Sequence, residues 1–198
     1  MTLPACAAMV RSTPDAAIAA ANRWTIEGGG VDARLCLGQA YVVRERWAAA
    51  AAAFAQAADE AVRAHDDRAA HLHVQAGNAW LAADNAKLAR EAFDAALALA
   101  TMSDMLRGET LIDRARADVA ANDLAAARTD LDRGLALVPA DPFGWYASAS
   151  LAARAGDTVR ARTDIAKATS LAPGDADIGK LSASLAGPAP ARAQPSGR

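Results

Sequence analysis

The sequence predicts an all-α fold built from stacked antiparallel helix pairs. Hydrophobic residues make up 53% of the 198 residues and aromatic residues only 5%, because alanine supplies much of the apolar fraction. Alanine is the strongest helix former but adds little volume to a core. Turn-forming pairs such as Asp84-Asn85 separate the helical stretches, and Pro139 and Pro173 each close a helix at positions 34 residues apart. Helices that pack this closely and recur at a fixed period indicate a repeat array.

The overall charge and hydropathy pattern exclude several classes of function. A net charge of −2 and a pI near 5.9 argue against a nucleic-acid partner, which requires a basic surface. No apolar run approaches the roughly 20 residues that cross a bilayer, so no membrane insertion is expected. Residues 1–10 lack the basic start and long apolar core of a signal peptide. As written, the protein is expected in the cytoplasm; it is expected in the periplasm if Met1 replaces a removed signal and the cysteines are oxidised.

The first segment, residues 1–30, is predicted to be a degenerate half-repeat. Ser12 or Thr13 can cap a helix, and Pro14 suits its first turn. Three consecutive glycines, residues 28–30, then end the helical stretch. A glycine run can also cradle a phosphate, but no Lys-Ser/Thr follows it and no strand precedes it. We therefore interpret the glycines as a turn between helices.

The strongest pattern in the chain follows that turn. Small and large residues occur there at fixed spacing: Leu37, Gly38, Tyr41, Ala50, Phe54 and Ala57. Gly38 allows a neighbouring helix to approach, while Tyr41 and Phe54 fill the angle between two helices. These spacings resemble the tetratricopeptide repeat, a 34-residue unit of two antiparallel helices.

The resemblance implies an all-α, right-handed superhelical solenoid of antiparallel helix pairs. Four repeats are expected, followed by a capping helix and a disordered tail: 31–64, 70–103, 108–141, 142–175, 176–186 and 187–198. Residues 104–107 are interpreted as an insertion between the second and third repeats. In the third repeat, Arg114 and Asp118 occupy positions where the family has leucine and tyrosine.

The capping helix has its apolar residues, Ile178, Leu181 and Leu185, on one face, which suits the exposed end of an array. A membrane-surface helix would instead need several basic residues, and only Lys180 is present. The tail after Leu185 consists largely of Gly, Pro, Ala, Gln and Arg, a composition typical of disorder.

No residue pattern indicates an enzyme, a metal site or a cofactor. His71 and His73 are two residues apart, so on a helix they point in different directions and cannot share one ion. No phosphate-binding or catalytic motif occurs. Paired carboxylates such as Asp130 and Asp132 are interpreted as solvated rather than as acid–base groups.

The two cysteines, Cys6 and Cys36, leave two alternatives open. Each is expected in the first helix of its unit, and those helices are neighbours in a solenoid. A disulfide forms if their Cα atoms lie within about 7 Å. The alternative is a pair of buried, reduced thiols that pack as small apolar groups.

In the resembling family, first helices line a concave groove that binds peptides. The groove positions carry over here to polar and aromatic residues: Gln39, His71, Gln75, Asn78, Glu109, Asp113, Arg116, Tyr146, Ser150 and Arg154. The sequence therefore predicts a non-catalytic scaffold that binds a peptide or protein partner in this groove. The same residue types also occur on any solvated helix face. The alternative function is a self-associating structural subunit that forms a homodimer through an array end.

Overall fold

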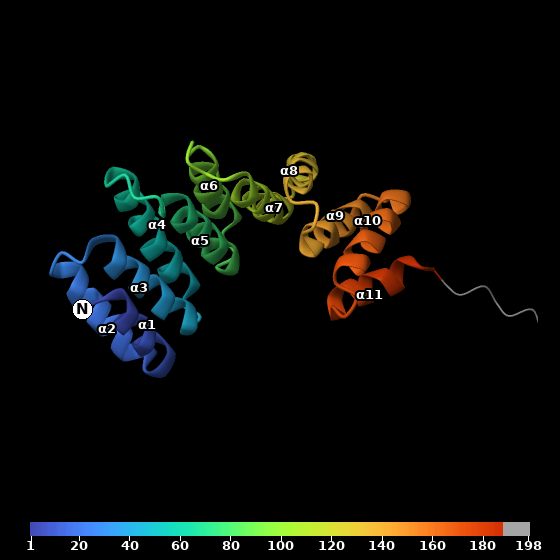
Figure 1. The fold of residues 1–198 in the computed structure, drawn as a ribbon. Helices are drawn as coiled ribbons and strands as arrows, with labels where there is room; N and C mark the ends of the chain where they lie inside the picture. The colour runs from blue at the N-terminus through green and yellow to red at the C-terminus, as the bar shows by residue number, and fades with distance from the viewer. Residues whose placement is uncertain (188–198) are drawn as a thin grey trace, which may run out of the picture. The chain divides into compact units, whose positions relative to one another are not determined.

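The computed structural model describes residues 1–187, and its regular secondary structure in that range is entirely α-helical. Eleven helices follow one another along this part of the chain (Figure 1): α1 (Leu3–Ser12), α2 (Pro14–Ile26), α3 (Gly30–Val43), α4 (Trp47–Arg63), α5 (Ala69–Ala82), α6 (Ala86–Leu97), α7 (Asp104–Ala120), α8 (Leu124–Leu137), α9 (Pro142–Arg154), α10 (Thr158–Leu171) and α11 (Ala176–Leu185). The prediction of an all-α fold is confirmed. The expected disordered tail lies outside the described residues, except for Gly187.

The chain divides into two compact units, Met1–Leu137 and Val138–Arg198. The first contains α1 to α8, and the described part of the second contains α9 to α11. This division was not predicted, because the sequence places the third and fourth expected repeats next to each other without a gap. One helix pair falls largely within each of the four expected repeats, and residues 1–30 contain α1 and α2.

The helix pairs share one kind of turn, which ends the first helix of each pair. The residue at this turn adopts the left-handed conformation, with φ between 53° and 79°: Glu45, Asp84, Asn122 and Gly156. Glycine, asparagine and aspartate adopt this conformation most readily. A side chain near the turn then caps the second helix in several pairs. For example, Asn85 Oδ1 accepts a hydrogen bond from the backbone N–H of Leu88 at 3.1 Å.

Residues 104–107, interpreted from the sequence as an insertion between repeats, form the first turn of α7. Ser103 Oγ caps this turn by accepting a hydrogen bond from the backbone N–H of Leu106 at 3.2 Å. Leu106 is buried and packs with Met102 and Ala96. The longer α7 therefore begins where a capping serine precedes an apolar residue, rather than at the start of the 34-residue period.

A glycine and a phenylalanine hold the two helices of a pair together in the first unit. Phe93 on α6 is fully buried, and Phe54 on α4 is 4% exposed. A Cβ atom added at Gly77 would lie 2.5 Å from Phe93 Cε1, and a Cβ atom at Gly38 would clash in the same way with the ring of Phe54. Only glycine lets each ring lie flat against the preceding helix, as the sequence pattern predicted.

Buried polar pairs lie beside the apolar contacts in the later helix pairs, where Leu131 and Ile165 are also buried. Arg114 on α7 donates two hydrogen bonds to Asp130 on α8, at 2.6 and 2.8 Å, and Asp130 is 4% exposed. The interpretation of Asp130 as a solvated carboxylate is therefore wrong. In the second unit, the hydroxyl of Ser148 on α9 donates to the buried carboxylate of Asp164 on α10.

The last helix, α11, packs onto the other two helices of the second unit. Ile178 is 1% exposed and lies in one cluster with Ala149, Ile165 and Ala168. Leu181 and Leu185 pack against the same cluster. The apolar face of α11 is thus occupied within its own unit. Among the described helices, none combines the length and apolar character needed to cross a bilayer.

Candidate functional site

The first unit contains a hollow of about 600 Å³ between α1, α3 and α5, with the start and middle of α4 completing its lining. Its lining consists of small or apolar side chains and a few polar ones: Ala7, Val10, Arg11, Gln39, Val42, Val43, Trp47, Phe54, Gln75, Asn78 and Ala79. We call this hollow the α1–α3–α5 groove. Its volume falls in the range of sites that bind small ligands or peptide side chains.

The apolar part of the groove presents a surface that an apolar side chain can cover. Val43 is 53% exposed, and Trp47 and Val42 are partly exposed. Phe54 links this surface to the core of the helix pair, since it lines the groove and also packs against Gly38. Covering exposed valine and tryptophan stabilises a complex by about 25 cal/mol per Å² of apolar surface removed from water.

Two glutamines supply hydrogen-bonding groups to the groove. Gln39 on α3 and Gln75 on α5 both line it, and neither side chain makes a hydrogen bond to another described residue. Each amide carries a donor and an acceptor. A peptide main chain presents the same two groups, so the glutamines can pair with an extended segment without first breaking a bond inside the protein.

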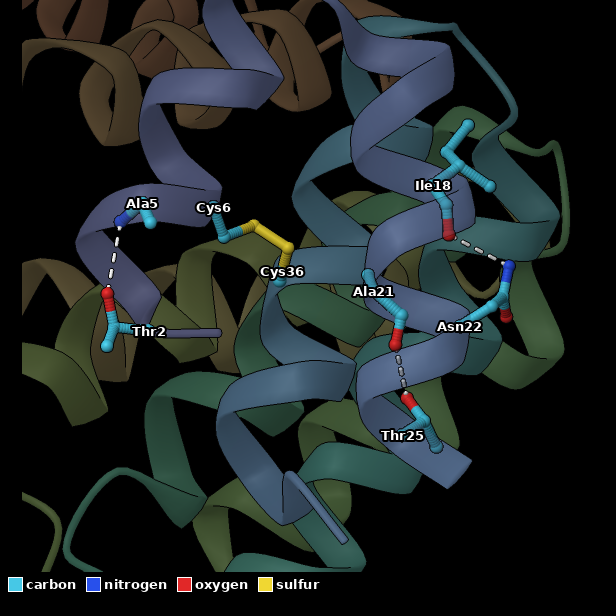
Figure 2. Close-up of a disulfide and its surroundings, with 8 residues drawn as sticks. All are labelled: Thr2, Ala5, Cys6, Ile18, Ala21, Asn22, Thr25 and Cys36. Carbon is cyan, nitrogen blue, oxygen red and sulfur yellow. Dashed lines mark hydrogen bonds between the residues drawn. A yellow bond between two sulfur atoms is a disulfide. The ribbon is translucent and has the colours of Figure 1, made fainter. Parts of the chain in front are cut away.

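A disulfide fastens α1, the first wall of the groove, to α3. Cys6 and Cys36 are bonded, their Cα atoms are 5.9 Å apart, and both side chains are fully buried (Figure 2). Of the two alternatives that the sequence left open, the structure contains the bonded one. Because α1 contributes Ala7, Val10 and Arg11 to the lining, the bond also fixes the position of that wall.

A polar cluster lies on α5 and α7, and it includes three of the expected groove residues. Asn78 Nδ2 donates to Asp113 Oδ2 at 2.9 Å, and the Arg116 guanidinium donates to Asp113 Oδ1 at 3.0 Å. Arg116 also lies 3.5 Å from Asn78 Oδ1. Asp113 thus occupies the groups of Asn78 and Arg116 that were expected to hold a ligand. A carboxylate that approaches Arg116 must compete with Asp113.

The other expected groove residues are not among those that line this groove. His71 on α5 and Glu109 on α7 are exposed and do not line it. Tyr146, Ser150 and Arg154 lie on α9, in the second unit, where the Ser150 hydroxyl donates to the backbone oxygen of Tyr146 at 2.9 Å. Three of the expected residues, Gln39, Gln75 and Asn78, line the α1–α3–α5 groove, and three other lining residues come from α1. The role of the remaining expected residues stays a prediction.

Sequence reasoning missed the contribution of α1 because this helix lacks the spacing of the repeat motif. The available signal was the pair of cysteines, since a bond between neighbouring first helices would have placed α1 beside α3. The residues next to Cys6 on α1, namely Ala7, Val10 and Arg11, then follow as candidates for the lining.

The histidines do not form a metal site within residues 1–187, where no group of three or more metal-ligating side chains converges. His73 is buried, and burial lowers its pKa even though Asp59 acts in the opposite direction. His71, two residues earlier, is exposed.

No protein-family model matches this sequence, and no curated protein matches it. Solved structures do match its fold. MamA, residues 41 to the end, from Desulfovibrio magneticus RS-1 is 17% identical, with a TM-score of 0.68 over 84% of this chain and 89% of that one. YrrB, described as a TPR protein with an unusual peptide-binding site, is 18% identical, with a TM-score of 0.65 over 84% and 82%.

TTC0263 from Thermus thermophilus, described as a thermophilic TPR protein, is 19% identical, with a TM-score of 0.63 over 87% of this chain and 90% of that one. The chain spans 39% of the length of a longer match, in the APC/C hetero-tetramer Cut9–Hcn1, at 14% identity and a TM-score of 0.56. These likenesses define a helical-repeat solenoid. The fold is that of the tetratricopeptide repeat, which confirms the resemblance seen in the sequence.

Proposed function

We propose that this protein is a non-catalytic scaffold that binds a peptide segment of a partner protein in the α1–α3–α5 groove. The observation that carries the proposal is the combination of exposed apolar side chains with two glutamine amides that have no hydrogen-bond partner among the described residues. The description of YrrB as a TPR protein with an unusual peptide-binding site is consistent with such a role.

The expected binding mode follows from the lining. An apolar side chain of the peptide covers Val42, Val43 and Trp47, while the peptide main chain pairs with the amides of the two glutamines. Burying apolar surface supplies most of the affinity, and the hydrogen bonds fix the direction of the segment. The cluster of Asn78, Asp113 and Arg116 lies further along α5 and α7, where it extends the polar surface.

Peptide selection on the purified protein tests this proposal. Peptides selected from a random display library should lose affinity at least tenfold for the variant Val43→Asp, because a charge then faces the apolar side chain. Lys87→Ala is the matched control, since Lys87 is highly exposed on α6 and does not line the groove. If Val43→Asp and Lys87→Ala bind the selected peptides as well as the wild type does, the groove is not the binding site.

A second set of variants tests whether the polar cluster on α5 and α7 and the expected residues on α9 take part. Asn78→Ala, Arg116→Ala and Tyr146→Ala should weaken capture of a partner while helicity is unchanged, if the polar cluster and α9 contribute. Sedimentation of the same samples distinguishes peptide capture from the alternative of self-association, since a monomer that binds peptide contradicts an obligatory dimer.

We further propose that the protein works in an oxidising compartment such as the periplasm. The disulfide between Cys6 and Cys36 supports this proposal, because such bonds persist where thiols are not continuously reduced. Localisation of the protein in its native cells by fractionation, together with counting of free thiols in each fraction, tests it. Fully reduced protein in the cytoplasmic fraction would contradict the proposal.

A further inference from the structure

Arg11 is the only charged residue among the eleven residues that line the α1–α3–α5 groove. It lies in the last turn of α1 and is exposed. Its guanidinium makes no ion pair or hydrogen bond with any described residue. The nearest acidic residue in the sequence, Asp15 at the start of α2, already pairs with Arg44 at 3.0 Å. The groove therefore has a permanent positive charge on one wall that no residue in the range 1–187 neutralises.

The position of this charge relative to the glutamines restricts the ligand. Gln39 and Gln75 lie on α3 and α5, so they define where a peptide main chain runs, whereas Arg11 lies on the third wall, α1. A side chain that leaves the main chain can reach α1 while the main chain stays beside the amides. The disulfide holds α1 against α3, so the helix that carries Arg11 does not have to be brought into position when the ligand binds.

We propose that the groove selects an acidic peptide: an internal segment with an aspartate or glutamate side chain next to an aliphatic or aromatic residue, in which the carboxylate pairs with Arg11. This inference rests on the proposed function. Arginine pairs with carboxylates through two parallel hydrogen bonds, which gives both charge and geometric selectivity. The adjacent apolar residue covers Val42 and Val43, which lowers the exposure of the ion pair to water and strengthens it.

The test is a comparison of peptides selected by the wild type and by Arg11→Glu. The library carries nine random residues joined to the carrier at both ends, so that no peptide has a free C-terminus. The wild type should enrich glutamate or aspartate beside leucine, isoleucine or phenylalanine, and Arg11→Glu should enrich lysine or arginine at the same place. Arg23→Glu is the matched control, because it makes the same change in the last turn of α2, outside the groove.

The affinity of one selected peptide gives the quantitative result. Replacing its glutamate by glutamine should weaken binding to the wild type about tenfold, and should have little effect on Arg11→Gln. Thermal unfolding of Arg11→Glu and Arg23→Glu should show equal midpoints, since each replaces a positive charge that favours the end of a helix by a negative charge that opposes it. A loss of binding confined to the first variant then reflects the ligand and not the fold.

Each other outcome overturns a defined part of the reasoning. If neither protein enriches any peptide, the proposed function fails. If wild type and Arg11→Glu enrich peptides of the same composition, peptide binding stands but the selection by Arg11 is wrong. If binders come only from a library with free C-termini, the carboxylate belongs to the chain end rather than to a side chain, and the inference of an internal segment is wrong.

Discussion

Removing the bond between Cys6 and Cys36 should destabilise the first unit by about 3–4 kcal/mol. The two residues are 30 positions apart in the sequence. In the chain-entropy model, closing a loop of this size reduces the entropy of the unfolded chain by an amount worth about 3.6 kcal/mol at 25 °C. Both cysteines are fully buried, so Cys6→Ala with Cys36→Ala removes the bond without placing polar groups in the core.

Urea denaturation followed by circular dichroism measures this effect on three samples: oxidised wild type, reduced wild type and the double alanine variant. Reduced wild type is the matched control, because it lacks the bond but keeps both sulfur atoms. Two free thiols per chain in the air-oxidised protein, or equal free energies of unfolding for the oxidised and reduced samples, would refute the reasoning.

The loss of stability should also be local. The first helix α1 contacts α2 and α3, while each later helix mainly contacts its neighbours along the chain. Hydrogen exchange should therefore accelerate in α1 after reduction and remain unchanged in α9 to α11. An equal acceleration throughout residues 1–187 would show that the array unfolds as one cooperative block.

Three further predictions concern the core. Phe54→Ala and Phe93→Ala should each lower the free energy of unfolding by about 3–5 kcal/mol in urea titrations, because each ring fills the space over a glycine. Arg114→Leu should cost a similar 3–5 kcal/mol by leaving the buried Asp130 unpaired, and adding Asp130→Leu should recover most of that loss in the same assay. Burial raises the pKa of Asp118, so the folded state holds this proton more tightly than the unfolded state. The resulting stabilisation is complete below the ordinary pKa of the carboxyl group and is lost as pH rises through the raised pKa of the folded state. Asp118→Asn should remove this pH dependence from the measured free energy of unfolding.

The parts of the fold that sequence could predict are those that local pattern controls. The turn residues Asp84 and Asn122, and the pairing of Gly77 with Phe93, depend on spacing within one helix pair. A fixed period in the sequence is therefore enough to locate them. The boundaries of the four repeats follow from the same period and stay predictions.

The parts that sequence could not predict depend on contacts between helix pairs. Repeat spacing places Asn78 and Arg116 on neighbouring helices, and they do lie 3.5 Å apart. It does not contain the side-chain orientations by which both bond to the carboxylate of Asp113. Arg11 was missed for a related reason, since α1 has no repeat motif and its place in the groove depends on a bond to a distant cysteine.

The sequence contains a pattern that predicts the burial of Asp130. Asp130 and Asp164 are 34 residues apart, and so are their partners Arg114 and Ser148. A carboxylate that recurs at the repeat period faces the same direction in each copy. Its partners on the preceding helices recur at the same period, which distinguishes a buried polar pair from a solvated face.

These polar pairs also affect how the chain assembles. Helices of similar sequence can dock onto the wrong neighbour while a repeat protein folds, since every pair offers much the same shape. Where α7 and α8 place Arg114 and Asp130, the corresponding positions of α5 and α6 hold Ala76 and Ala92. If α7 took the place of α5 beside α6, its guanidinium would face an alanine instead of the carboxylate of Asp130. The buried polar pairs thus favour correct docking, because a helix that carries one member of a pair loses its hydrogen bonds when it packs against a similar helix elsewhere in the chain.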